Sequence, residues 1–221
     1  MSKWKIEALK EHIREKHENS TVLVEFVDSV VRTIDIYKYH ECEVYPYLNN
    51  EPNVHLFELF KELTTNYNKR LEHEEETIKI QAHIQAAFHN SRAMYDLFAQ
   101  LLNGVLLSNN YPIYKCNINN VCSDLPDSKL KLDLIDVLNS ENYKYVNSFI
   151  NTIKHRNLLK FPHTIDFVES KSAIKIAQFD FNGQHFEEKW GIEALTCTYE
   201  LTKQLIGLGQ QLNIECGVKY A

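Results

Sequence analysis

Glycine and proline are scarce in this chain, with six glycines and five prolines among 221 residues. Because these two residues interrupt regular structure most strongly, their scarcity indicates long uninterrupted helices. No apolar run approaches the roughly 18 residues that suggest a membrane-spanning helix. The N-terminus, MSKWKIEALKEHIREKHE, is charged where a secretory signal would be apolar. We therefore expect a cytoplasmic protein that is not associated with a membrane.

Cysteine is also sparse, and its positions form no pattern. There are five cysteines, an odd number, and none forms a Cys-x-x-Cys pair, which excludes a disulfide framework and a cysteine-based zinc site. His83 and His89 lie on one expected helix without the carboxylate that a recognised zinc motif requires, so we interpret them as structural. We therefore expect no metal and no cofactor.

The charge balance limits the kind of partner. The net charge is −6, which excludes a protein that coats duplex DNA, so any contact with nucleic acid must be local. A chain of 221 residues with 44% hydrophobic residues is long enough to bury a substantial core. We expect one domain that spans residues 1–221.

Apolar residues recur at helical spacing over most of the chain. This periodicity predicts helices over residues 3–17, 22–39, 56–63, 71–107, 128–138 and 143–160, with Ser20 and Ser140 as N-caps of the second and the sixth. Prolines and asparagines predict loops over 46–53 and 109–127, and the second is the longest expected connection without regular structure, a candidate lid or ordered surface loop.

The periodicity changes after Pro162. Residues 164–168 and 173–181 alternate with period two, and Asn182-Gly183 favours a tight hairpin turn. A last helix is expected from about residue 187, and its Gly-x-Gly at 207–209 favours close helix packing. The fold class expected is mainly α, an antiparallel helical bundle with a small β-hairpin before the last helix.

The window 141–163, which ends in NTIKHRNLLKFPH, is the one conspicuously basic stretch. It contains four cations and one anion, a net charge of +3. Because Pro162 disfavours a helical conformation at the residue before it, we expect the helix to end near Lys160 and His163 to lie just beyond. The negative end of the helix dipole would there favour a protonated imidazole. Arg156 is seven residues before His163, which is almost two helical turns.

An arginine beside a histidine is the minimum that metal-free cleavage of RNA requires. The imidazole can transfer a proton to or from a ribose hydroxyl or the leaving oxygen, and the guanidinium can stabilise charge on the phosphorane. One such pair rarely suffices to catalyse the cleavage. Two pairs that meet across a symmetric dimer would supply the acid, the base and the electrostatic clamp together.

Arg156-Asn157 followed by His163, at the end of a long helix, resembles the Arg-polar-(several residues)-His signature of HEPN domains. Residues 89–103 are similar to the central helix, and 151–157 to the motif helix, of the Cthe-like bacterial branch of that family, which has a hairpin after the motif. The resemblance covers about residues 70–215. The proline immediately before His163 departs from the commonest pattern.

The resemblance implies a helical bundle that forms a homodimer with the motifs facing each other. Many members of the family are metal-independent endoribonucleases in toxin, antiphage or RNA-processing systems, and others only bind nucleotides or RNA. The resemblance assigns Arg156 and His163 to the catalytic pair and Asn157 to the supporting polar position. A toxin–antitoxin setting would add a neutralising protein partner.

The leading interpretation is a homodimeric endoribonuclease that cuts RNA without metal. Lys154, His155 and Lys160 are its candidate RNA-binding residues, and His155 is a second candidate for the operative imidazole. The main alternative is a non-catalytic HEPN module that binds RNA or a nucleotide, or an antitoxin-like partner protein. A structural helical dimer, in which the basic window only complements a helix dipole, is the third interpretation.

Overall fold

The computed structural model describes residues 4–48 and 55–218 and is mainly helical, as the periodicity predicted. The helices are α1 (Ile6–Lys16), α2 (Ser20–Leu48), α3 (Leu56–Thr65), α4 (Tyr67–Leu106), a 3₁₀ turn η1 (Ile113–Lys115), α5 (Ile118–Asp124), α6 (Lys129–Asn139), α7 (Glu141–His155) and α8 (Gly191–Glu215). Within these residues no helix combines the length and the apolar character needed to cross a membrane.

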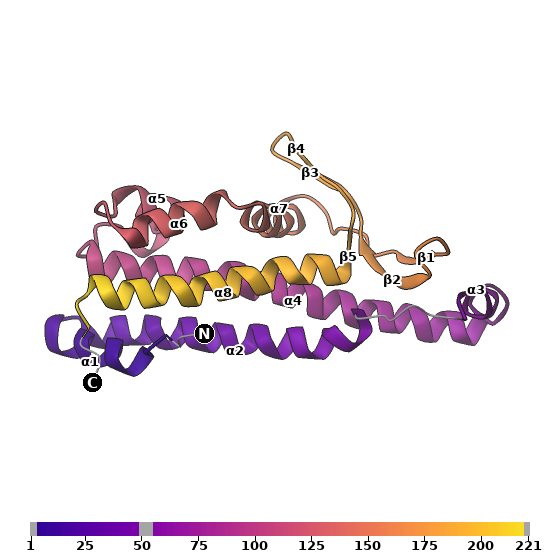
Figure 1. Ribbon diagram of the computed structural model, residues 1–221, viewed down its shortest axis with the longest axis horizontal. Coiled ribbons are helices and arrows are strands. Elements are labelled where there is room, and N and C mark those ends of the chain that lie inside the picture. Colours follow the sequence, from indigo (N-terminus) through magenta and orange to yellow (C-terminus); the bar gives the residue numbers. More distant parts are fainter. Residues whose placement is uncertain (1–3, 49–54, 219–221) are drawn as a thin grey trace.

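Three long helices form the body of the molecule. Figure 1 shows α2, α4 and α8 running side by side, with α5, α6 and α7 covering one side, α1 at one end and α3 at the other. Their inner faces carry large side chains that are fully buried, such as Tyr37, Phe88 and Phe98. The Tyr95 hydroxyl is buried with them and donates to the carbonyl of Leu201, 2.8 Å away, which joins α4 to α8.

The strands lie between α7 and α8 in the sequence. They are β1 (His163–Asp166), β2 (Lys171–Ile176), β3 (Phe179–Phe181), β4 (Gln184–Phe186) and β5 (Lys189–Trp190). They form an antiparallel sheet in the order β1-β2-β5 and a separate β3–β4 hairpin. Asn182 and Gly183 turn that hairpin with φ angles of 50° and 80°. The Asn-Gly turn is therefore confirmed, and the predicted single hairpin is in fact two.

The end of α2 differs from the prediction. Helix α2 continues to Leu48 and contains Pro46, which we expected to begin a loop. A proline inside a helix removes one backbone hydrogen bond. Here Val44 and Leu48 are both buried, each about 1% exposed, and their packing holds the last turn in place. The rest of the predicted loop, through residue 53, lies outside the described residues.

The connection 109–127 was predicted to lack regular structure, and this prediction was wrong. It contains η1 and α5, whose N-cap Asn117 accepts from the backbone N–H of Asn120 at 3.0 Å. Ile118 and Val121 are fully buried, so the segment packs on the core instead of forming a lid. Its start is held by Asn103 on α4, whose side-chain amide bonds both the N–H and the C=O of Tyr111.

Candidate functional site

The end of α7 differs from the prediction. We expected the helix to reach Lys160, but it ends at His155, and Arg156 is its C-cap with φ −129° and ψ −81°. The helix ends early because alternate residues after it are buried. Leu159 and Phe161 are each 6% exposed whereas Lys160 between them is exposed, and only an extended chain directs alternate side chains inward.

The basic window lies on the surface. The side chains of Lys154, His155, Arg156, Asn157 and Lys160 are all exposed. Burial, and to a smaller extent the charge of Lys154, lowers the pKa of His89 on α4. The window therefore presents cations to the solvent, as a site for a polyanion requires.

Arg156 is docked on the β3–β4 hairpin. Its Nη1 donates to the carbonyl of Asp180 at 2.9 Å, and its guanidinium carbon lies 4.8 Å from the ring centroid of Phe181. This hydrogen bond occupies one of the five N–H donors of an arginine. The guanidinium is thus oriented by the hairpin while it keeps donors for another ligand.

His163 lies in a different environment. It is the first residue of β1, opposite Ile174 of β2, and its Nε2 is 3.2 Å from the hydroxyl oxygen of Ser172. Burial, and secondarily the neighbouring His73, lowers its pKa to about 4. The expectation of a protonated imidazole at a helix end was therefore wrong, because the chain carries His163 away from the helix into a strand.

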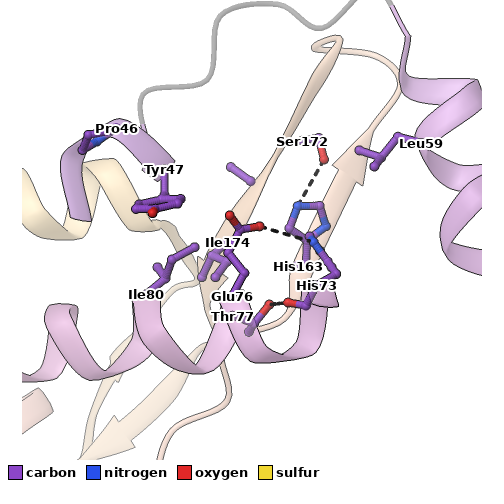
Figure 2. A pocket seen from close by; sticks show the side chains of 11 residues that line it. Pro46, Tyr47, Leu59, His73, Glu76, Thr77, Ile80, His163, Ser172 and Ile174 are labelled. Carbon is purple, nitrogen blue, oxygen red and sulfur yellow. Dashed lines mark hydrogen bonds and ion pairs between the residues drawn. The ribbon is translucent and has the colours of Figure 1, made fainter. Parts of the chain in front are cut away.

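The imidazole of His73, on α4, contacts that of His163. The ring centroids are 4.1 Å apart and the planes are at 86°. The Nδ1 of His73 is 3.8 Å from a carboxylate oxygen of Glu76, and its Nε2 is buried without a hydrogen-bond partner among the described residues. Figure 2 shows His73, Glu76, His163 and Ser172 gathered between α4 and the strands.

Two adjoining cavities share this histidine pair. One has a volume of about 370 Å³ and is lined by both histidines with Glu76 and Ser172. The other, of about 750 Å³, is mostly apolar and is also lined by Phe60, Arg70 and Phe167. The Phe60 and Phe167 rings contact each other, with centroids 6.3 Å apart. Arg70, two histidines and two phenylalanines thus line one hollow, together with Glu74, whose carboxylate is 3.9 Å from the Nε of Arg70.

Arg70 and His73 were not identified from the sequence, because residues 72–76 are nearly all glutamate and have the composition of a solvated helix start. A signal was present, since Arg70, His73 and Thr77 recur at intervals of three and four residues and so share one helix face. All three line the larger cavity. What the sequence did not show is that β1 covers this face.

The structure does not bring Arg156 and His163 into contact within one chain. Among residues 4–48 and 55–218, no hydrogen bond, ion pair or ring contact joins the two side chains. Comparison of the chain with protein-family models, curated proteins and solved structures found no match. Its function is therefore inferred from the residues and their geometry.

Proposed function

We propose that this chain is an RNA- or nucleotide-binding protein of the HEPN type and that its ligand enters the cavity beside His163. The observation that carries the proposal is the lining of the larger cavity, where Arg70, His73 and His163 border the same hollow as Phe60 and Phe167. Aromatic rings stack on nucleobases, and a guanidinium binds phosphate. The resemblance of Arg156-Asn157 and His163 to the HEPN motif supports the same ligand class.

The exposed basic window extends this proposal to a chain of nucleotides. Lys154, Arg156 and Lys160 are exposed cations in a protein whose net charge is −6, so a polyanion would be attracted to them locally. In this scheme the window binds phosphates of the backbone, and the cavity binds one nucleotide. Asn157 and His155 contribute hydrogen bonds at the end of α7.

Binding is favoured over cleavage by the contacts of Arg156 and His163. Arg156 is held by Asp180 and Phe181, whereas His163 contacts His73 and Ser172. Catalysis by the Arg156–His163 pair would therefore require a second copy of the chain or release of Arg156 from the hairpin. Ligand binding requires neither.

The test is fluorescence anisotropy with a labelled single-stranded RNA and a labelled mononucleotide in EDTA. We expect Arg70→Gln and His163→Gln to weaken binding of both ligands about tenfold, since each removes a polar contact in the cavity. Arg156→Gln should weaken RNA binding and lower its salt dependence, with little effect on the mononucleotide. Lys129→Gln, an exposed charge on α6, is the matched control. Equal affinity in the cavity variants, folded by circular dichroism, would contradict the proposal.

The second candidate function is metal-independent cleavage of RNA by a homodimer. It is favoured by the contact between two imidazoles, which places two groups able to transfer protons side by side. The pKa of about 4 leaves His163 neutral near pH 7 but also makes it a weak base. His73, whose buried Nε2 is unpartnered among the described residues, would assist, and Arg156 from either copy or Arg70 would stabilise the phosphorane.

Cleavage is tested by incubating RNA with the purified chain in EDTA. If the pair acts as proposed, Arg156→Ala and His163→Ala lose activity and remain folded, and sedimentation shows a dimer. Full activity in both variants would rule this mechanism out. If activity is lost in Arg70→Ala but kept in Arg156→Ala, the guanidinium that stabilises the phosphorane is that of Arg70.

A further inference from the structure

A second pair of histidines joins two helices at a different place in the bundle. His40 on α2 and His83 on α4 face each other with their Nδ1 atoms 3.1 Å apart. His83 follows His73 by ten residues on the same helix, which places it about 15 Å further along the axis. The pair therefore belongs to neither of the cavities described above.

The two rings are held in place by their surroundings. Tyr39 contacts the ring of His40 edge to face, with centroids 5.2 Å apart, and lies 6.3 Å from the ring of His83. Both histidines are partly buried, and they project from α2 and α4, which pack along each other. The approach of the two nitrogens is thus defined by rigid helices instead of mobile loops.

Two Nδ1 atoms can approach so closely only in particular protonation states. If both carried a proton the N–H groups would repel, so at least one Nδ1 presents a lone pair. The contact thus already presents an unprotonated ring nitrogen, which is the form of imidazole that binds a metal.

The separation of the nitrogens matches a metal site. Zinc binds imidazole nitrogen at about 2.0–2.1 Å, so two ligands at a tetrahedral angle have nitrogens about 3.3 Å apart. The observed 3.1 Å lies within a few tenths of an ångström of that spacing. The rings are tilted by 56° to each other, and rotation of the side chains would have to direct both lone pairs at one ion.

We propose that His40 and His83 bind a divalent late first-row cation, Zn²⁺ or Cu²⁺, through their Nδ1 atoms and thereby link α2 to α4. Both rings carry their remaining proton on Nε2 in the bound state, so a proton on Nδ1 moves to Nε2 through solvent before the ion binds. Among the described residues no group of three or more His, Cys, Asp or Glu could hold a metal. Water therefore completes the coordination, and the affinity is lower than that of a four-ligand structural site. Cu²⁺ should bind more tightly than Zn²⁺.

The test uses the full chain without a histidine tag, dialysed against a chelator and titrated with Zn²⁺ or Cu²⁺ by calorimetry. We expect one equivalent of either ion to bind and to raise the unfolding temperature. His40→Ala/His83→Ala should abolish that binding. His55→Ala/His185→Ala is the matched control, since each double variant keeps eight of the ten histidines, and it should bind as the unmodified chain does.

Electron paramagnetic resonance of the Cu²⁺ form provides a second readout, with hyperfine coupling to two imidazole nitrogens expected. His83→Gln, a milder change, should leave one coupled nitrogen and serves if the double variant does not fold. The proposal would be overturned if both His40/His83 variants bind the ion as the unmodified chain does. It would also be overturned if titration of the unmodified chain gives no more heat than titration of buffer. RNA binding at the His163 cavity is measured separately, so failure of one proposal leaves the other open.

Discussion

The imidazole of His163 packs against that of His73 at 4.1 Å, edge to face, and this contact joins the strand β1 to the helix α4. It arises because Leu159 and Phe161 anchor the chain after α7 in the core and direct it toward α4 as a strand. The same contact buries His163 and lowers its pKa, so one packing event determines both the position and the protonation state of the main candidate residue.

The pH dependence of stability follows from this burial. The imidazole has a pKa of 6.5 when unperturbed and about 4 in the folded chain, so between these values the unfolded state binds more protons. The free energy of unfolding should therefore fall as the pH drops from 6.5 to 4, and His163 should have no effect on its slope above 6.5. We expect His163 to contribute about 1–2 kcal/mol to this fall, allowing for its partial solvent access.

The measurement is urea unfolding at several pH values for the unmodified chain and for His163→Gln. Other histidines with lowered pKa values, such as His40 and His89, contribute to both curves, so the difference isolates His163. Parallel curves would show that the imidazole is not buried in the folded state.

Gly207 and Gly209, two of the glycines of α8, predict opposite effects of the same substitution. A Cβ at Gly209 would lie 2.4 Å from the ring of Trp4, which is buried and donates to Asn213 at 3.1 Å. Gly209→Ala should therefore destabilise the fold by about 1–3 kcal/mol. A Cβ at Gly207 meets nothing within 4 Å, so Gly207→Ala should stabilise the helix by up to about 1 kcal/mol. Denaturant midpoints that shift in the same direction would contradict this prediction.

Asn103 clamps the segment that follows α4. Its buried side chain donates to the carbonyl of Tyr111 at 2.8 Å and accepts from the N–H of Tyr111 at 3.0 Å. Asn103→Ala should cost about 1–3 kcal/mol and speed hydrogen exchange at the Tyr111 amide. Asn110→Ala, which removes an exposed hydrogen bond to Asp124, is the control and should change neither quantity appreciably. Unaltered exchange at Tyr111 would show that the clamp is unimportant.

Gly183 controls the hairpin on which Arg156 is docked. Its φ of 80° is in the left-handed region, and a Cβ there meets nothing within 4 Å, so a side chain costs only backbone strain. Gly183→Ala should destabilise the turn by about 1–2 kcal/mol, and Gly183→Asn by less, because asparagine tolerates this conformation. Hydrogen exchange at the β3 and β4 amides measures the effect. A hairpin that is more stable in Gly183→Ala than in Gly183→Asn would contradict the left-handed conformation assigned to this residue.

Local chemistry made several elements predictable. The predicted cap Ser140 accepts from the backbone N–H of Tyr143 and begins α7 as expected. Ser128 caps α6 in the same way, by accepting from the N–H of Lys131. Arg92 and Asp96, four residues apart on α4, form an ion pair at 2.6 Å, as this helical spacing favours. Gly209 allows close packing, as the Gly-x-Gly motif suggested, whereas Gly207 faces open space. These features depend on residues within one or two turns of each other.

The candidate site was only partly predictable. The basic window and His163 were identified from the chain alone, and the structure shows that Lys154, Arg156 and Lys160 of the window are exposed. Arg70 and His73 were not, because the start of α4 is polar enough to be interpreted as a free surface. Only the return of the chain through β1 makes that helix face the wall of a cavity.

The order of residues was sufficient to determine a helical protein with an Asn-Gly turn and an exposed basic segment, since helical periodicity, caps and tight turns depend on neighbours a few positions away. Tertiary packing decided where α7 ends and what surrounds the two motif residues. It directed Arg156 onto Phe181 and His163 onto His73, because the burial of Leu159 and Phe161 outweighs the local preference to continue the helix.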